Sequence, residues 1–190
     1  RGLGWLLGGH DLLRPRAPGA AAQLTFTGRF GAMRESERRV TIGLTTGAPE
    51  QQPPGTTLLL CTKAHDLPGC LGLAAELRPG CIIATTNGLG IDRMLGEALP
   101  GVPRGRLLLD VGFERGADGS VTIHGEPRAV LASGAADDVL GPIVRRLSAA
   151  GFLLTLEPDP EAAEWRKLSL NVLVNTLCSI AGTPNGALLE

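Results

Sequence analysis

The sequence contains few of the residues from which metal centres and disulfide frameworks are built. Its four cysteines include no Cys-x-x-Cys spacing, and its three histidines are scattered along the 190 residues. Short spacings of these residue types are the usual signature of a metal site, so we expect no metal ion to be bound. Few cysteines without a framework spacing are also typical of a reducing compartment, which favours a cytoplasmic protein.

Long apolar runs and an excess of charge of one sign are missing as well. No apolar run approaches the roughly 20 residues that a membrane helix requires, so we expect no membrane association. The net charge of −1 provides no basic field that would attract nucleic acid. With 43% hydrophobic and 19% charged residues the composition is that of a globular protein. Its length suffices for one full core, or for one domain and part of another.

Lysine is almost absent. Of 18 basic residues only Lys63 and Lys167 are lysines, and the others are arginines. A biased codon usage would explain this scarcity, but it would not explain where the two lysines occur. A compact, titratable ammonium is chemically different from a guanidinium. Both positions are therefore candidates for functional residues.

Asparagine is equally sparse, and two of the four asparagines share one predicted helix with Lys167. This helix should extend over about residues 160–181 and end before Gly182. Lys167, Asn171 and Asn175 recur in it every four residues, which places their side chains in one stripe. The remaining helix residues are mostly apolar, so we expect the helix to be buried on several faces. Polar groups on such a helix are costly unless they meet polar partners, and a ligand-binding cleft would provide them.

Upstream of this helix the sequence alternates between strands and helices. The segments 57–62 and 81–85 are continuously apolar, which predicts parallel strands covered on both faces. Residues 106–114 and 120–124 should form an antiparallel hairpin closed by residues 116–119. A proline-rich step at residues 157–160 predicts a domain boundary. In all we expect strands over 23–30, 39–44, 57–62, 81–85, 106–114, 120–124, 128–131 and 152–156, and helices over 66–77, 91–99, 135–150 and 160–181.

Polar side chains follow two of the predicted parallel strands. Lys63 comes just after the first strand and Asn87 just after the second. Ligands of open parallel sheets bind beyond the carboxyl ends of the strands, so both residues are candidates for a binding site. Local sequence leaves two simpler interpretations open: Lys63 as a solvated surface amine, and Asn87-Gly88 as an ordinary turn.

Four motifs together resemble the ketopantoate reductase (2-dehydropantoate 2-reductase) family. The most specific is the run Trp-Arg-Lys-Leu-Ser-Leu-Asn-Val-Leu-Val-Asn at residues 165–175, followed by Asn-Gly-Ala-Leu at 185–188. Cys-Thr-Lys-Ala at 61–64 and Asn-Gly-Leu-Gly at 87–90 are similar to the family's cofactor-side motifs, and Gly-His-Asp at 9–11 is similar to the motif before its second strand. The resemblance covers most of the chain.

The resemblance implies an α/β fold and an oxidoreductase activity. Residues 1–158 would form a Rossmann-type NAD(P)-binding domain with a mainly parallel sheet. Residues 159–190 would begin an all-α C-terminal domain with its first helix. The implied reaction is NADPH-dependent reduction of ketopantoate to pantoate, a step of pantothenate and coenzyme A biosynthesis.

The resemblance also implies roles for the residues of the helical stripe and for Asn87. Lys167 would be the general acid that protonates the ketone oxygen as negative charge develops on it. Asn171 and Asn175 would bind the hydroxyl and carboxylate region of the substrate. Asn87 would orient either the nicotinamide ribose or the substrate.

Other residues would bind the cofactor. Lys63 would neutralise charge near the cofactor or substrate. Arg14, together with Arg16, would bind the 2′-phosphate that distinguishes NADP from NAD. Gly4 would be part of the glycine fingerprint that approaches the pyrophosphate, although this alignment places Arg1 at the position of the fingerprint's second glycine.

The departures from the family pattern keep two further hypotheses open. Thr85-Thr86 and Leu109-Asp110-Val111 differ from the expected residues, so the substrate could be that of another 2-oxo or 3-hydroxy acid dehydrogenase. Alternatively, a chain without the complete glycine fingerprint could be a remnant that does not turn over and acts as an interaction module. A short helical domain would also expose apolar surface, which favours a homo-oligomer.

Overall fold

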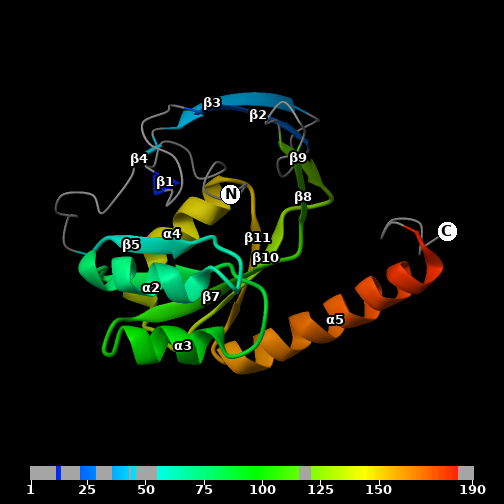
Figure 1. Ribbon diagram of the computed structural model, residues 1–190. Helices are drawn as coiled ribbons and strands as arrows, with labels where there is room; N and C mark the ends of the chain where they lie inside the picture. The colour runs from blue at the N-terminus through cyan, green and yellow to red at the C-terminus, as the bar shows by residue number, and fades with distance from the viewer. Residues whose placement is uncertain are drawn as a thin grey trace.

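The computed structural model describes residues 12–13, 22–28, 36–42, 44–45, 55–115 and 121–183 (Figure 1). Its centre is a five-stranded sheet with the strand order β11-β10-β7-β6-β5. Only the pair β7 and β10 is antiparallel, and the other three pairs are parallel. The expected mainly parallel sheet is therefore confirmed. Its strands are β5 (Thr57–Leu60), β6 (Cys81–Ala84), β7 (Arg104–Leu109), β10 (Arg128–Ala132) and β11 (Leu153–Glu157).

Helices cover both faces of this sheet. Helices α2 and α3 lie on one face of the sheet, and helix α4 lies on the opposite face (Figure 1). Ile82 of β6 joins an apolar cluster with Leu67 and Leu95 on the first face, and the next residue, Ile83, joins a cluster with Leu147 on the other. Burial on both sides explains why β6 is apolar without alternation. The helices are α2 (Leu67–Glu76), α3 (Ile91–Ala98), α4 (Asp137–Ala149) and α5 (Pro160–Ala181).

The predicted strand over 106–114 is wrong as a single strand, because the chain changes sheets within it. β7 ends at Leu109 in the central sheet, and β8 begins at Gly112 in a second sheet with the order β3-β2-β9-β8. β8 and β9 do form the expected antiparallel hairpin, and its turn lies outside the described residues. The second sheet consists of β2 (Ala22–Gly28), β3 (Ser36–Ile42), β8 (Gly112–Arg115) and β9 (Val121–His124), and a short parallel pair consists of β1 (Leu12–Leu13) and β4 (Leu44–Thr45).

The bounds of α5 agree with the sequence-based prediction, and its ends show why. The Asp159 side chain accepts a hydrogen bond from the Ala162 N–H at 3.1 Å, and Pro160 occupies the first turn. Gly182 ends the helix in the left-handed conformation, with a φ of 61°. An aspartate cap, an early proline and a terminal glycine are the preferred residues at these three places.

The expectation that α5 is buried on several faces is wrong for the described residues. The helix contacts β7 and β10 and then extends away from both sheets (Figure 1). Ala163 and Glu164 are buried, whereas Leu173 and Ile180 are 58% and 79% exposed. Only the start of the helix reaches the central sheet, so its later apolar side chains find no packing partner there. None of the described helices combines the length and the apolar character needed to cross a membrane.

Candidate functional site

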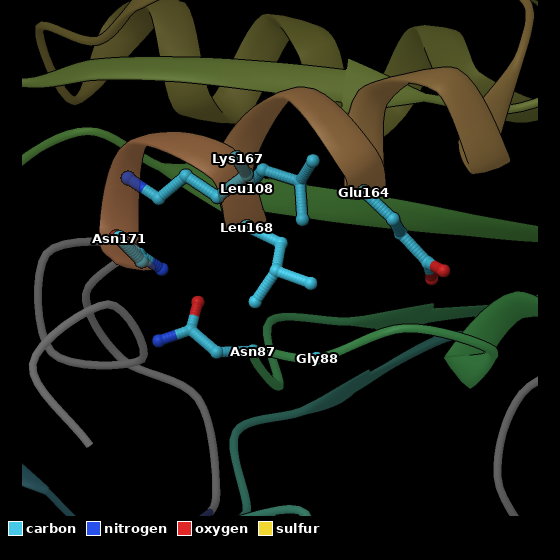
Figure 2. Close-up of a pocket in the computed structure, with 7 residues that line it drawn as sticks. All are labelled: Asn87, Gly88, Leu108, Glu164, Lys167, Leu168 and Asn171. Atoms are coloured by element: carbon cyan, nitrogen blue, oxygen red, sulfur yellow. The ribbon is translucent and has the colours of Figure 1, made fainter. Parts of the chain in front are cut away.

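A cavity of about 220 Å³ lies where α5 crosses the carboxyl end of β6 (Figure 2). One wall is the face of α5, and the opposite wall is the loop that follows β6. Apolar side chains from β7 and α5 lie between the polar groups. The lining residues are Asn87, Gly88, Leu108, Glu164, Lys167, Leu168 and Asn171.

The cavity brings together three of the residues proposed from the sequence. Asn87 extends from the loop after β6 toward the helix, and Lys167 and Asn171 contribute from successive turns of α5 (Figure 2). Asn175 continues the stripe by a further turn but is exposed and does not line the cavity. The stripe is therefore in contact with the cavity at two of its three predicted positions.

Of the residues proposed to bind the cofactor, the structure describes Asn87, which lines the cavity, and Lys63. Lys63 follows β5, as expected, but its side chain is exposed and does not line the cavity. Its backbone carbonyl accepts hydrogen bonds from the Asp66 and Leu67 N–H groups, both at 3.1 Å. Gly4 and Arg14 lie outside the described residues. Of the two described residues proposed for the cofactor, Asn87 is thus at the cavity and Lys63 is not.

Lys167 is held by two groups at the end of β7. Its ammonium donates a hydrogen bond to the Leu109 carbonyl oxygen at 2.9 Å and forms an ion pair with the carboxylate of Asp110. The lysine side chain is 19% exposed. An ammonium has three N–H donors, so among the described contacts one donor is left for an oxygen atom of a ligand. Asp110, at a position where the sequence departs from the family pattern, therefore contacts the candidate general acid directly.

A buried ion pair next to the cavity was not predicted from the sequence. Arg106 of β7 donates from Nε to a carboxylate oxygen of Glu164 on α5 at 2.6 Å. The exposed fractions of the two side chains are 0% and 2%. Burial lowers the pKa of the Arg106 guanidinium, and the neighbouring Glu164 carboxylate opposes this shift.

The ion pair is connected to the backbone on both sides of the cavity loop. Before the loop, Arg106 donates to the Ala84 carbonyl oxygen at 2.9 Å and to the Thr86 carbonyl oxygen. After the loop, Glu164 accepts from the Gly90 N–H at 2.8 Å and the Asp92 N–H at 3.2 Å. The carboxylate thus occupies the N-terminus of α3, where helix N–H groups lack partners within the helix.

One sequence signal could have drawn attention to Glu164. It lies three residues before Lys167, so it extends the polar stripe of α5 by one turn toward the helix start. Arg106 carried no comparable signal, because it lies in a short run of alternating Arg and Gly before three leucines.

Comparison with known proteins gives one curated relative. No family model matches the chain. A 2-dehydropantoate 2-reductase of Halobacterium salinarum is 27% identical over 160 residues, which are 80% of this chain and 51% of the relative. The chain therefore spans about half the length of the curated relative it matches.

Solved structures share the fold. A 2-dehydropantoate 2-reductase of Geobacter metallireducens has a TM-score of 0.74 at 20% identity, covering 92% of this chain and 58% of that one. The enzyme of the same name from Methylococcus capsulatus has a TM-score of 0.67 at 20% identity, covering 83% and 52%. A D-mandelate dehydrogenase solved with NADH and anilino(oxo)acetate has a TM-score of 0.61 at 20% identity, covering 83% and 51%.

These likenesses confirm the Rossmann-type fold and the resemblance inferred from the motifs. In sequence and in fold, this chain is similar to the ketopantoate reductases.

Proposed function

We propose that the chain forms the cofactor domain and the first catalytic helix of an NADPH-dependent 2-oxo acid reductase, with ketopantoate as its substrate. Residues 1–158 would be the cofactor domain and residues 159–190 the start of the helical domain. The observation that carries the proposal is the single cavity lined by Asn87, Lys167 and Asn171 at the carboxyl end of a parallel strand. The Halobacterium relative supports the choice of substrate.

The size of the cavity supports a small substrate. About 220 Å³ lies below the 300–1,000 Å³ of cavities that hold drug-sized ligands. Such a volume suits a compact oxo acid. Leu108 and Leu168 would contact its aliphatic part, and the ammonium and carboxamides would bind its oxygens.

The described residues fit the nicotinamide end of a cofactor. Asn87 presents a carboxamide beside the cavity, and Gly88 presents backbone without a side chain, with open space where a Cβ would lie. The N-terminus of α3 is already occupied by Glu164, so a phosphate group would have to bind elsewhere. We propose Gly4, Arg14 and Lys63 for that part of the cofactor, as the family resemblance implies.

When bound, NADPH would supply the hydride for the proposed reduction of the ketone. The third N–H donor of Lys167 hydrogen-bonds the ketone oxygen and transfers a proton as negative charge develops there. Asn171 holds the substrate so that its carbonyl faces the nicotinamide, with Asn175 binding the more distant part of the substrate. Asn87 orients the nicotinamide ribose or the substrate from the opposite wall. Leu109 and Asp110 keep the ammonium at this place.

A second candidate, the reduction of a different 2-oxo acid, is favoured by Asp110. Its carboxylate neutralises the Lys167 ammonium and adds negative charge beside the cavity. Because Asp110 departs from the family pattern and contacts the candidate general acid, the oxo acid that binds beside Lys167 can differ from ketopantoate. The D-mandelate dehydrogenase that shares the fold acts on a related class of compound.

The test is NADPH oxidation by the 190-residue chain with ketopantoate and with aromatic and aliphatic 2-oxo acids. Lys167→Ala should lower kcat/KM by about 10²–10⁴-fold, the usual contribution of a general acid. Arg166→Ala is the matched control, because Arg166 is the preceding residue of α5 and pairs with Glu157 instead of lining the cavity. The proposal would be overturned if the wild-type chain reduced every oxo acid no faster than the Lys167→Ala variant does. A preference for another oxo acid would replace ketopantoate by the second candidate.

A further inference from the structure

The buried ion pair of Arg106 and Glu164 joins the two walls of the cavity. Arg106 comes from the central sheet and Glu164 from α5, and the contact between them is 2.6 Å long. We propose that these two side chains are positioning residues that set the cavity loop 87–90 against Lys167 and Asn171. This inference rests on the proposed function, because it assigns a role within the same site.

On the loop side, the pair holds the backbone immediately before and after the cavity residues. Arg106 donates to the carbonyl oxygens of Ala84 and Thr86, and Thr86 directly precedes Asn87. Glu164 accepts from the Gly90 N–H, two residues after Gly88. The two ends of the loop are thereby tied to one pair of side chains, which restricts where the Asn87 carboxamide can lie.

On the helix side, Glu164 sets the rotation of α5. Lys167 lies three residues and Asn171 seven residues further along the helix, which at a rise of about 1.5 Å per residue is roughly 4.5 Å and 10.5 Å along the axis. A helix that turned by one residue, about 100°, would carry both side chains out of the cavity. The neighbouring Ala163 packs with Leu108, but a small apolar contact permits more rotation than a directional hydrogen bond does.

The chemistry of the pair suits a geometric role better than a purely stabilising one. A buried ion pair is often replaceable by apolar residues without loss of stability, because desolvation offsets the attraction between the charges. What apolar residues cannot replace is the planar fork of N–H donors on a guanidinium, which fixes several acceptors at set angles. Arg106 uses this fork on three acceptors from two different elements.

The test uses the full chain and does not require turnover. The chain has four asparagines, so ¹⁵N-asparagine labelling gives a spectrum of only four backbone and four carboxamide groups. Glu164→Gln should shift the signals of Asn87 and Asn171. Because this variant leaves Arg106 buried without a counterion and could fail to fold, Arg106→Met/Glu164→Leu removes both charges together and serves as the second variant.

The matched control is Glu157→Gln. Glu157 also pairs with an arginine of α5, at 2.8 Å, but this pair does not line the cavity. The control should leave the Asn87 signals in place. The positioning role is supported if the folded double variant displaces the Asn87 and Asn171 signals and the control does not. Unchanged Asn87 and Asn171 signals in the folded double variant would overturn the inference.

The kinetic readout separates this inference from the proposed function. If the wild-type chain reduces an oxo acid, the double variant should lose about 10²-fold in kcat/KM, as expected for misplaced reacting groups, even where its melting temperature is restored. If the wild-type chain shows no turnover, the proposed function fails while the asparagine spectra still decide the positioning role. Wild-type kcat/KM in the double variant would contradict the inference.

Discussion

Replacing Glu164 alone should destabilise the protein more than replacing Glu164 and Arg106 together. In Glu164→Leu the Arg106 guanidinium stays buried, with an exposed fraction of 0%, and loses its counterion. The Gly90 and Asp92 N–H groups lose their acceptor at the same time. Removing one partner of a buried ion pair costs about 3–5 kcal/mol, which is roughly a third to a half of a total stability near 10 kcal/mol.

This loss can be measured by urea unfolding followed by far-ultraviolet circular dichroism. With a denaturant slope of about 2 kcal/mol per molar urea, the midpoint of Glu164→Leu should fall by roughly 1.5–2.5 M. Arg106→Met/Glu164→Leu should recover much of this loss, because no unpaired charge remains buried. Recovery should be incomplete, since the Ala84 and Thr86 carbonyls lose a donor.

Glu157→Gln is again the control, and its midpoint should stay close to that of the wild type because its partner Arg166 is 61% exposed to solvent and needs no counterion. The reasoning would be refuted if Glu164→Leu unfolded within about 0.5 kcal/mol of the wild type, the range of an ordinary surface substitution. It would also be refuted if the double variant were less stable than Glu164→Leu.

Three further predictions concern the cavity and the thiols. Asn171→Ala should lower kcat/KM more than Asn175→Ala, because of the two side chains only that of Asn171 lines the cavity. Steady-state kinetics with the preferred oxo acid would contradict the cavity as the active site if Asn171→Ala had no larger effect than Asn175→Ala. Asp110→Asn should lower KM for an anionic oxo acid, because it removes a negative charge beside Lys167. A raised KM would show that the Asp110 carboxylate does not repel the substrate. Burial raises the pKa of the Cys81 thiol to about 11. At pH 8 Cys81 should therefore react with a disulfide reagent far more slowly than Cys70, which is only partly buried. Equal reaction rates of the two thiols in the folded protein would contradict the burial of Cys81.

Local patterns predicted the elements well where local chemistry determines them. Both ends of α5 follow from an aspartate cap, an early proline and a terminal glycine. The unbroken apolar run of β6 identified a strand buried on both faces. The position just after a parallel strand predicted Asn87 as a binding-site residue, and the four-residue spacing on α5 predicted Lys167 and Asn171. All three line the cavity, whereas Lys63, which was predicted from the same strand-end argument as Asn87, does not.

Contacts between distant segments could not be predicted in this way. Arg106 and Glu164 are 58 residues apart, and nothing in their local sequences indicates that both charges are buried. Charged residues are almost never fully buried unless they are paired, so each one alone predicts a solvated side chain. The ion pair of Lys167 with Asp110 likewise joins distant segments, because 57 residues separate the two in the chain.

The exposure of α5 was mispredicted because composition does not reveal which surfaces meet. An apolar helix predicts burial, but burial requires a partner. Of the described α5 residues, Ala163 and Glu164 near its start and Cys178 near its end are buried, and most of the apolar side chains between them are exposed. The division between β7 and β8 was missed because both halves are strand-like and only their pairing differs.

The N-terminus of α3 has a consequence for the order in which the chain folds. Gly90 precedes this helix in the left-handed conformation, with a φ of 74°, and has no side chain with which to cap it. The acceptor comes from Glu164, 74 residues later in the chain. During synthesis, the first turn of α3 and the loop before it therefore stay without their cap until α5 has emerged and docked. The Gly90 and Asp92 amides should become protected from hydrogen exchange when α5 packs against the central sheet. The two walls of the cavity would then form in a single folding event.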